Sequence, residues 1–89
     1  MQSNVLYEQK RNLKSIAPQV LNTINILHKN DAITRDEKNT MIGLVQRGLI
    51  DRKFYTPLVE KFWRIANKST QDWLYDLCEG VIVTIQKEI

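Results

Sequence analysis

Residues 32–49 read AITRDEKNTMIGLVQRGL, and the rest of the chain is organised around this stretch. Thr34 and Glu37 have the spacing of a capping box, in which the threonine hydroxyl accepts a hydrogen bond from the third helical N–H and the glutamate carboxylate accepts one from the capping residue's own N–H. Gly48 predicts the end of the helix, because glycine readily adopts the left-handed conformation of a helix stop. The stretch therefore predicts a helix over about residues 35–47.

Apolar residues at helical spacing predict four further helices. They cover residues 4–15, 18–29, about 57–67 and 69–89. Proline is favoured at the first helical position, so Pro18 and Pro57 mark two of the starts, with Thr56 as the cap of the second. Ser69 or Thr70 is expected to cap the last helix, and Asp51 to cap a short helical turn before Thr56.

The last segment has an alternative interpretation, because the β-branched run over residues 81–85 favours extended structure. A helix is preferred, since a lone strand would have no partner to pair with. The short link over residues 30–33 predicts an antiparallel hairpin of the helices on either side of it. The predicted fold class is therefore all-α, a compact bundle of four to five short helices forming a single domain over residues 1–89.

Length and composition limit the possible classes of protein. Eighty-nine residues with 43% hydrophobic and 26% charged side chains are typical of one globular domain. No apolar run approaches the ~20 residues of a membrane span. The first residues lack a signal-peptide profile, and Cys78, as the single cysteine, cannot form an intramolecular disulfide. These features predict an intracellular protein, cytoplasmic or nuclear, with no membrane partner.

No pattern of catalytic, metal-binding or nucleotide-binding residues occurs in the sequence. His28 has no second ligand at metal-binding spacing, so a packed histidine is expected there. Cys78 lies on the apolar side of its helix and is expected to be a buried small hydrophobe. The sequence therefore predicts a protein that is not an enzyme and that has no cofactor and no metal.

Charges of opposite sign are concentrated in different segments. Residues 47–68 include six basic and two acidic side chains, whereas residues 70–89 include four acidic and one basic. Asp72, Asp76 and Glu79 share one side of the last helix. Two faces of opposite sign favour a protein partner or self-association, whereas a nucleic-acid binder would more often have one continuous basic surface. The alternative is that both are ordinary solvated faces.

A winged-helix DNA-binding domain is a tempting interpretation of residues 44–52, but its two helices and turn do not fit between Ile33 and Gly48. The sequence instead predicts a protein–protein interaction domain, an adaptor or regulatory module, that binds an amphipathic helix or a short acidic and hydrophobic segment of another protein. The candidate partner-binding residues are Arg52, Lys53, Phe54, Tyr55, Lys61, Trp63, Arg64, Lys68 and Trp73.

Two alternatives remain open at this point. The tryptophans among the candidates are equally compatible with packing in the core. The basic residues among them also suit nucleic-acid binding through a basic face on the helix predicted over residues 57–67. These residues are Arg52, Lys53, Lys61, Arg64 and Lys68.

Overall fold

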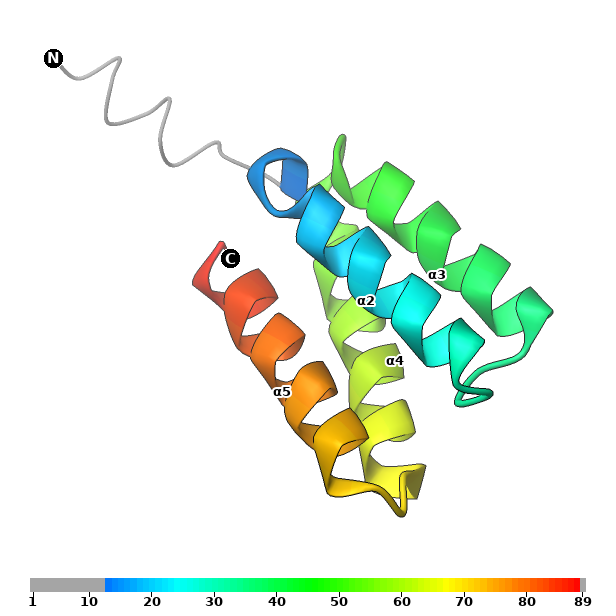
Figure 1. Cartoon of the computed structure of the whole chain (residues 1–89). Helices are drawn as coiled ribbons and strands as arrows, with labels where there is room; N and C mark the ends of the chain where they lie inside the picture. Colours follow the sequence, from blue (N-terminus) through cyan, green and yellow to red (C-terminus); the bar gives the residue numbers. More distant parts are fainter. Residues whose placement is uncertain (1–12, 89) are drawn as a thin grey trace, which may run out of the picture.

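The computed structural model describes residues 13–88 and is a bundle of four α-helices. The helices are α2 (Ala17–Lys29), α3 (Arg35–Gly48), α4 (Tyr55–Lys68) and α5 (Asp72–Lys87), with short 3-10 helices η1 (Leu13–Ser15) and η2 (Arg52–Phe54). Consecutive helices run antiparallel, and α5 closes the bundle against α2 (Figure 1). Residues 13–88 contain no strand. The predicted all-α bundle and the hairpin of α2 with α3 are confirmed. Most of the helix predicted over residues 4–15 lies outside the described residues.

Apolar side chains from all four α-helices form one core. Ten of them are completely buried: Val20, Ile24, Leu27, Met41, Tyr55, Leu58, Phe62, Cys78, Ile82 and Ile85. The burial pattern also decides the form of residues 81–85. Val81 and its neighbour Ile82 are both buried, whereas Val83 is 44% exposed. A strand would place consecutive side chains on opposite faces, so this pattern belongs to a helix, as predicted.

The predicted capping box starts α3. The Thr34 hydroxyl accepts a hydrogen bond from the Glu37 N–H at 3.1 Å, and the Glu37 carboxylate accepts one from the Thr34 N–H at 2.8 Å. This second bond holds the pKa of Glu37 below its ordinary value, because the Thr34 N–H stabilises the ionised carboxylate. The local sequence is therefore sufficient to position the start of this helix.

The predicted left-handed stop at Gly48 is wrong. Gly48 is the last residue of α3 and is buried, and no glycine within residues 13–88 has a positive φ. Leu49 keeps right-handed helical dihedrals and donates to the Val45 carbonyl at 3.1 Å, and the Asp51 N–H donates to the Arg47 carbonyl at 2.9 Å. These bonds satisfy the last carbonyls of the helix without a left-handed residue, and the chain turns into an extended conformation only at Asp51.

The left-handed stop lies instead at the end of α2, at Asp31, which has a φ of 60°. The Ala32 N–H donates to the Leu27 carbonyl at 2.9 Å, and the Asp31 N–H donates to the His28 carbonyl at 3.1 Å. This is the bond pattern of a Schellman motif, in which glycine is the usual left-handed residue. Aspartate tolerates that conformation better than most residues but not as well as glycine.

We expect Asp31→Gly to raise the free energy of unfolding by about 0.5–1 kcal/mol, because glycine adopts a positive φ without steric cost. Asn30→Gly is the control. Asn30 has a φ of −101°, and its side-chain amide donates to the Ile26 carbonyl at 2.8 Å. The control should lower the free energy of unfolding by about 1 kcal/mol, because it loses this bond. Urea denaturation measures both changes, and equal destabilisation by the two variants would contradict the assignment of the stop.

The start of α4 also differs from the prediction. Asp51 caps η2 as predicted, accepting a hydrogen bond from the Lys53 N–H at 3.0 Å, but η2 runs directly into α4. Phe54, not Thr56, is the N-cap residue, and no side chain caps the helix. Pro57 is the third residue of α4 and is tolerated there, because N–H groups in the first turn lack helical partners.

The cap predicted for α5 is wrong as well. The N-cap residue is Gln71, which makes no side-chain capping bond. The helix therefore begins later in the sequence than a cap at Ser69 or Thr70 predicts. The Ser69 hydroxyl instead accepts from the Gln71 N–H at 3.1 Å, which forms a turn between α4 and α5. This local bond competes with capping and moves the helix start to Asp72.

Candidate functional site

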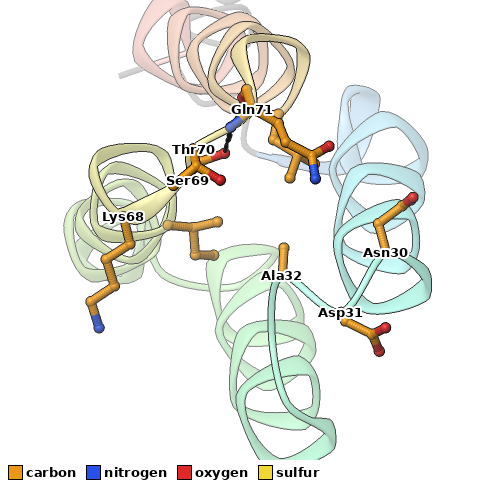
Figure 2. A pocket seen from close by; sticks show the side chains of 9 residues that line it. Asn30, Asp31, Ala32, Lys68, Ser69, Thr70 and Gln71 are labelled. Atoms are coloured by element: carbon orange, nitrogen blue, oxygen red, sulfur yellow. Dashed lines mark hydrogen bonds between the residues drawn. The ribbon is translucent and has the colours of Figure 1, made fainter.

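Two turns that are distant in the sequence enclose a hollow at one end of the bundle. The turn from α2 to α3 and the turn from α4 to α5 face one another across it (Figure 2). The hollow has a volume of about 250 Å³ and is lined by Asn30, Asp31, Ala32, Ile65, Lys68, Ser69, Thr70, Gln71 and Leu74. Ala32, Ile65 and Leu74 are the apolar members of this lining, and the others are polar or charged.

A second hollow of about 110 Å³ lies between α3 and α4 and adjoins the first. The two hollows share Ala32, Ile65 and Lys68, so we treat them as one groove. The second part adds Glu37, Met41, Lys61 and Arg64. Met41 is completely buried and Ile65 nearly so, so these side chains form an apolar floor beneath charged edges.

Three basic side chains of α4 form the edge of the groove, and we call them the basic row: Lys61, Arg64 and Lys68. Arg64 and Lys68 are exposed and Lys61 is half-buried. Glu37 lies on the α3 side, and its pKa is lowered first by the Thr34 hydrogen bond and more weakly by the charges of Lys68 and Lys61. No ion pair within residues 13–88 involves the basic row, so its charge is available to an occupant of the groove.

The outer side of α5 carries the opposite charge. Asp72, Asp76 and Glu79 are all exposed there, and we call them the acidic row. An aromatic pair joins the two helices: the rings of Trp63 in α4 and Tyr75 in α5 lie 6.2 Å apart, tilted by 57°. The aromatic pair therefore lies where α4 meets α5, whereas the basic row lies on the α3 side of α4.

The predicted site residues separate into groups. Lys61, Arg64 and Lys68 line the groove, whereas Arg52, Lys53 and Phe54 form η2 at the opposite end of α4. There the Phe54 ring has the Arg47 guanidinium at 5.8 Å and the Lys53 ammonium at 5.3 Å from its centroid, and the Arg52 guanidinium donates to the Glu88 carbonyl at 2.6 Å.

The aromatic candidates differ in exposure. Tyr55 is completely buried and so does not lie on the surface where sequence analysis placed it. It begins α4 two residues before the predicted start, which turns its ring into the core. Trp63 is half-buried beside Tyr75, and Trp73 is 45% exposed with its indole N–H donating to the Gln71 side chain at 2.6 Å. Both tryptophans therefore reach the surface.

Sequence reasoning missed the groove's apolar floor and its α3 side. Ala32, Met41 and Ile65 are ordinary apolar residues in three different segments, and the sequence around Glu37 predicts only its capping role. No local pattern relates residues 32 and 65. The helical spacing of the basic row is the sequence signal that predicts one edge of the groove.

His28 and Cys78, the two side chains considered for metal binding or catalysis, lie on different helices, α2 and α5. Within residues 13–88 no cluster of three or more histidine, cysteine or acidic side chains is arranged to hold a metal ion. His28 is half-buried in α2. Cys78 is buried as predicted, and burial raises the pKa of its thiol to about 11, which suppresses the nucleophilic thiolate.

Comparison with protein-family models, curated proteins and solved structures found no significant match. Among the helices described over residues 13–88, none combines the length and the apolar character needed to cross a membrane.

Proposed function

We propose that this chain is a non-enzymatic protein-interaction domain of the adaptor or regulatory kind, and that the groove binds an acidic and hydrophobic helical segment of another protein. The observation that carries the proposal is the apolar floor of Ala32, Met41 and Ile65 beside the basic row. An apolar side chain of a docked segment would lie against Ala32 and the edge of Ile65, above the buried Met41, while carboxylates of the segment meet the basic row.

The dimensions support a helical segment. The basic row extends from Lys61 to Lys68, a separation of seven residues, which is about 10 Å at about 1.5 Å per residue. That length corresponds to two turns of a docked helix, so carboxylates one turn apart on the segment can reach successive members of the row. Because the row is exposed or half-buried, we expect it to contribute mainly to the association rate.

Nucleic acid is a less suitable occupant. Among residues 13–88 no aromatic side chain lines the groove, and stacking of bases on aromatic rings supplies much of single-strand binding. Glu37 lies on the α3 side of the groove, and the acidic row lies on α5. These carboxylates would also repel a phosphate backbone that runs across α3 or α5. A location inside the cell, where the single thiol stays reduced, is part of the proposal.

The test is a titration of fluorescent probes with the full chain. The probes are a short amphipathic helical peptide of glutamate and leucine and, separately, single- and double-stranded oligonucleotides. We expect the peptide to bind and the combined Lys61→Glu, Arg64→Glu and Lys68→Glu variant to lose at least about tenfold in affinity, mostly through slower association. Circular dichroism of the variant checks that it remains helical.

A matched control reverses three basic residues that do not line the groove, Lys29, Arg35 and Lys87, to glutamate. This control has the same net charge as the combined Lys61→Glu, Arg64→Glu and Lys68→Glu variant, which we call the groove variant. The control should bind the peptide like the wild type. Equal losses in the two variants would mean that net charge, not the groove, controls binding. Oligonucleotide binding with a log–log salt slope of about −2.7, abolished by the groove variant, would establish nucleic-acid binding instead.

A further inference from the structure

The turn from α3 to η2 lies at the end of the bundle opposite the two turns that enclose the larger hollow (Figure 1). Ile50, in this turn, is 90% exposed, which is the highest value among the large apolar side chains described over residues 13–88. It lines neither hollow of the groove. A single exposed apolar residue is common on a protein surface, so the case for Ile50 depends on its neighbours.

The backbone around Ile50 forms a hydrogen-bonded turn. The Ile50 N–H donates to the Arg47 carbonyl at 3.0 Å, and the Asp51 N–H donates to the same carbonyl at 2.9 Å. On the two sides of the turn, Leu49 and Phe54 are half-buried and pack against the core. These contacts hold the turn on the bundle while the Ile50 side chain remains in solvent, so Ile50 can meet an external surface without a change of fold.

Positive charges surround this apolar side chain. Arg47, Arg52 and Lys53 are all exposed. Asp51 is the one acidic residue between positions 47 and 54, and it pairs with Lys53 at 3.5 Å. The Arg47 and Lys53 cations also lie over the Phe54 ring, so contacts with a ring that packs on the core position them beside the turn. The exposed tryptophan, tyrosine and valine of α5 lie instead on the helix of the acidic row.

Hydrogen bonds join the end of α5 to the same end of the bundle. The Arg52 guanidinium donates to the Glu88 carbonyl at 2.6 Å, and the Ser15 hydroxyl donates to the Glu88 carboxylate at 3.1 Å. Lys14 and Lys87 are the sequence neighbours of Ser15 and Glu88, and both are exposed. We use the name basic end for Ile50 and the charged residues described around it, which are Lys14, Arg47, Asp51, Arg52, Lys53, Lys87 and Glu88. Five of these seven charges are positive and two are negative.

We propose that the basic end docks on an anionic membrane surface, with the Ile50 side chain inserted among the lipid headgroups and the surrounding lysine and arginine side chains at the lipid phosphates. Attachment of this type combines burial of apolar surface with attraction between cationic side chains and anionic lipids. It needs no membrane-spanning helix, so it revises the sequence-based prediction of no membrane partner, which considered only spans and signal peptides. The cytoplasmic leaflet is anionic, which agrees with the proposed location inside the cell.

A bilayer suits the basic end better than a nucleic acid or a protein does. A nucleic-acid backbone would satisfy the cations but would leave Ile50 in solvent. A protein partner would need a pocket shaped for one projecting isoleucine, whereas the interface of a bilayer accepts an apolar side chain without a preformed pocket. Charge alone therefore suits several partners, and Ile50 is the residue that distinguishes among them.

The test is co-sedimentation of the full chain with lipid vesicles at low salt. One set of vesicles contains phosphatidylcholine alone, and the other contains equal parts of phosphatidylcholine and phosphatidylserine. We expect binding to the anionic vesicles only, and Ile50→Ser should weaken it at least about threefold, because the interface buries this apolar side chain. Val83→Ser is the matched control, since it replaces an exposed apolar side chain on α5, and it should bind within about twofold of the wild type.

The contribution of charge is tested with equal changes at the two ends of the bundle. Arg47→Gln combined with Lys53→Gln should weaken vesicle binding at least about tenfold at low salt, because each cation near an anionic surface contributes to binding. The control, Lys29→Gln with Arg35→Gln, has the same net charge but lies beside the turn from α2 to α3, and it should bind within about threefold of the wild type. Equal losses in the two variants would overturn the inference, because net charge alone would then explain binding.

Three other results would also overturn it. The first is a wild type that does not bind the anionic vesicles at low salt. The second is vesicle binding that Ile50→Ser leaves unchanged, with oligonucleotides bound equally well, since that describes a general polyanion surface. The third is self-association in sedimentation equilibrium that Ile50→Ser abolishes, which would assign Ile50 to a contact between copies. The inference does not rest on the groove: Ile50→Ser should bind the glutamate and leucine peptide like the wild type, so either proposal can fail alone.

Discussion

Ile82→Ala is expected to lower the free energy of unfolding by about 2–5 kcal/mol, which is a large part of the 5–15 kcal/mol that usually stabilises a domain. Ile82 is completely buried among core residues of α5 and its neighbours. Removing its side chain loses the transfer free energy of three carbon atoms and leaves a cavity that the surrounding helices fill only in part. Urea denaturation followed by circular dichroism measures the change.

Val83→Ala is the matched control on the next residue. Val83 is 44% exposed, and alanine has the higher helix propensity, so this change should alter the free energy of unfolding by less than about 0.5 kcal/mol. Val81 is buried beside Ile82, so Val81→Ala should also be destabilising. Large effects at positions 81 and 83 with a small effect at position 82 would indicate a strand and contradict α5.

The thiol of Cys78 is expected to react with a thiol-specific reagent at least about 100-fold more slowly in the native protein than in the urea-unfolded chain at pH 8. Burial raises its pKa from an ordinary value near 9 to about 11, and a shift of two pH units reduces the reactive thiolate about 100-fold. Exclusion of the reagent from the core slows the reaction further. Rapid labelling of the folded protein would show that α5 opens readily in the native state.

The same shift makes stability depend on pH in the alkaline range. The folded state favours the neutral thiol of Cys78. The contribution of this thiol to the free energy of unfolding is therefore complete below about pH 9, where the unfolded thiol is still protonated, and is lost as the pH rises through about 11. Cys78→Ala removes this contribution. The difference in unfolding free energy between wild type and variant should therefore fall by roughly 2–3 kcal/mol over that range. A constant difference would contradict the raised pKa.

Much of the fold follows from local sequence signals. The Thr34 and Glu37 capping box starts α3 because both hydrogen bonds form within one turn and need no distant partner. The apolar spacing of residues 81–85 predicts the buried side of α5, including the burial of Ile82, because a helix with that pattern can cover the core. The class of fold and the approximate helix boundaries can therefore be predicted from residues that are close together in the sequence.

The site depends on contacts between distant residues. Nothing in the sequence around Ala32 indicates that it shares a groove with Ile65, since the two are brought together by the packing of α3 against α4. The basic row was predicted, because helical periodicity puts its members on one side of α4. Its position beside an apolar floor, which supports the proposed binding, required the packed bundle.

The predictions that the structure contradicts also failed because contacts between distant residues decide the outcome. Gly48 has the local signature of a left-handed stop, yet the left-handed residue is Asp31, and Tyr55 was expected on the surface but is completely buried. Local propensities differ by about 1 kcal/mol, whereas burying one large side chain is worth about 1.5–3 kcal/mol. The sequence by itself determined the helices and their apolar sides. Only the tertiary structure decided where the chain turns and which side chains remain exposed, because core packing outweighs these local preferences.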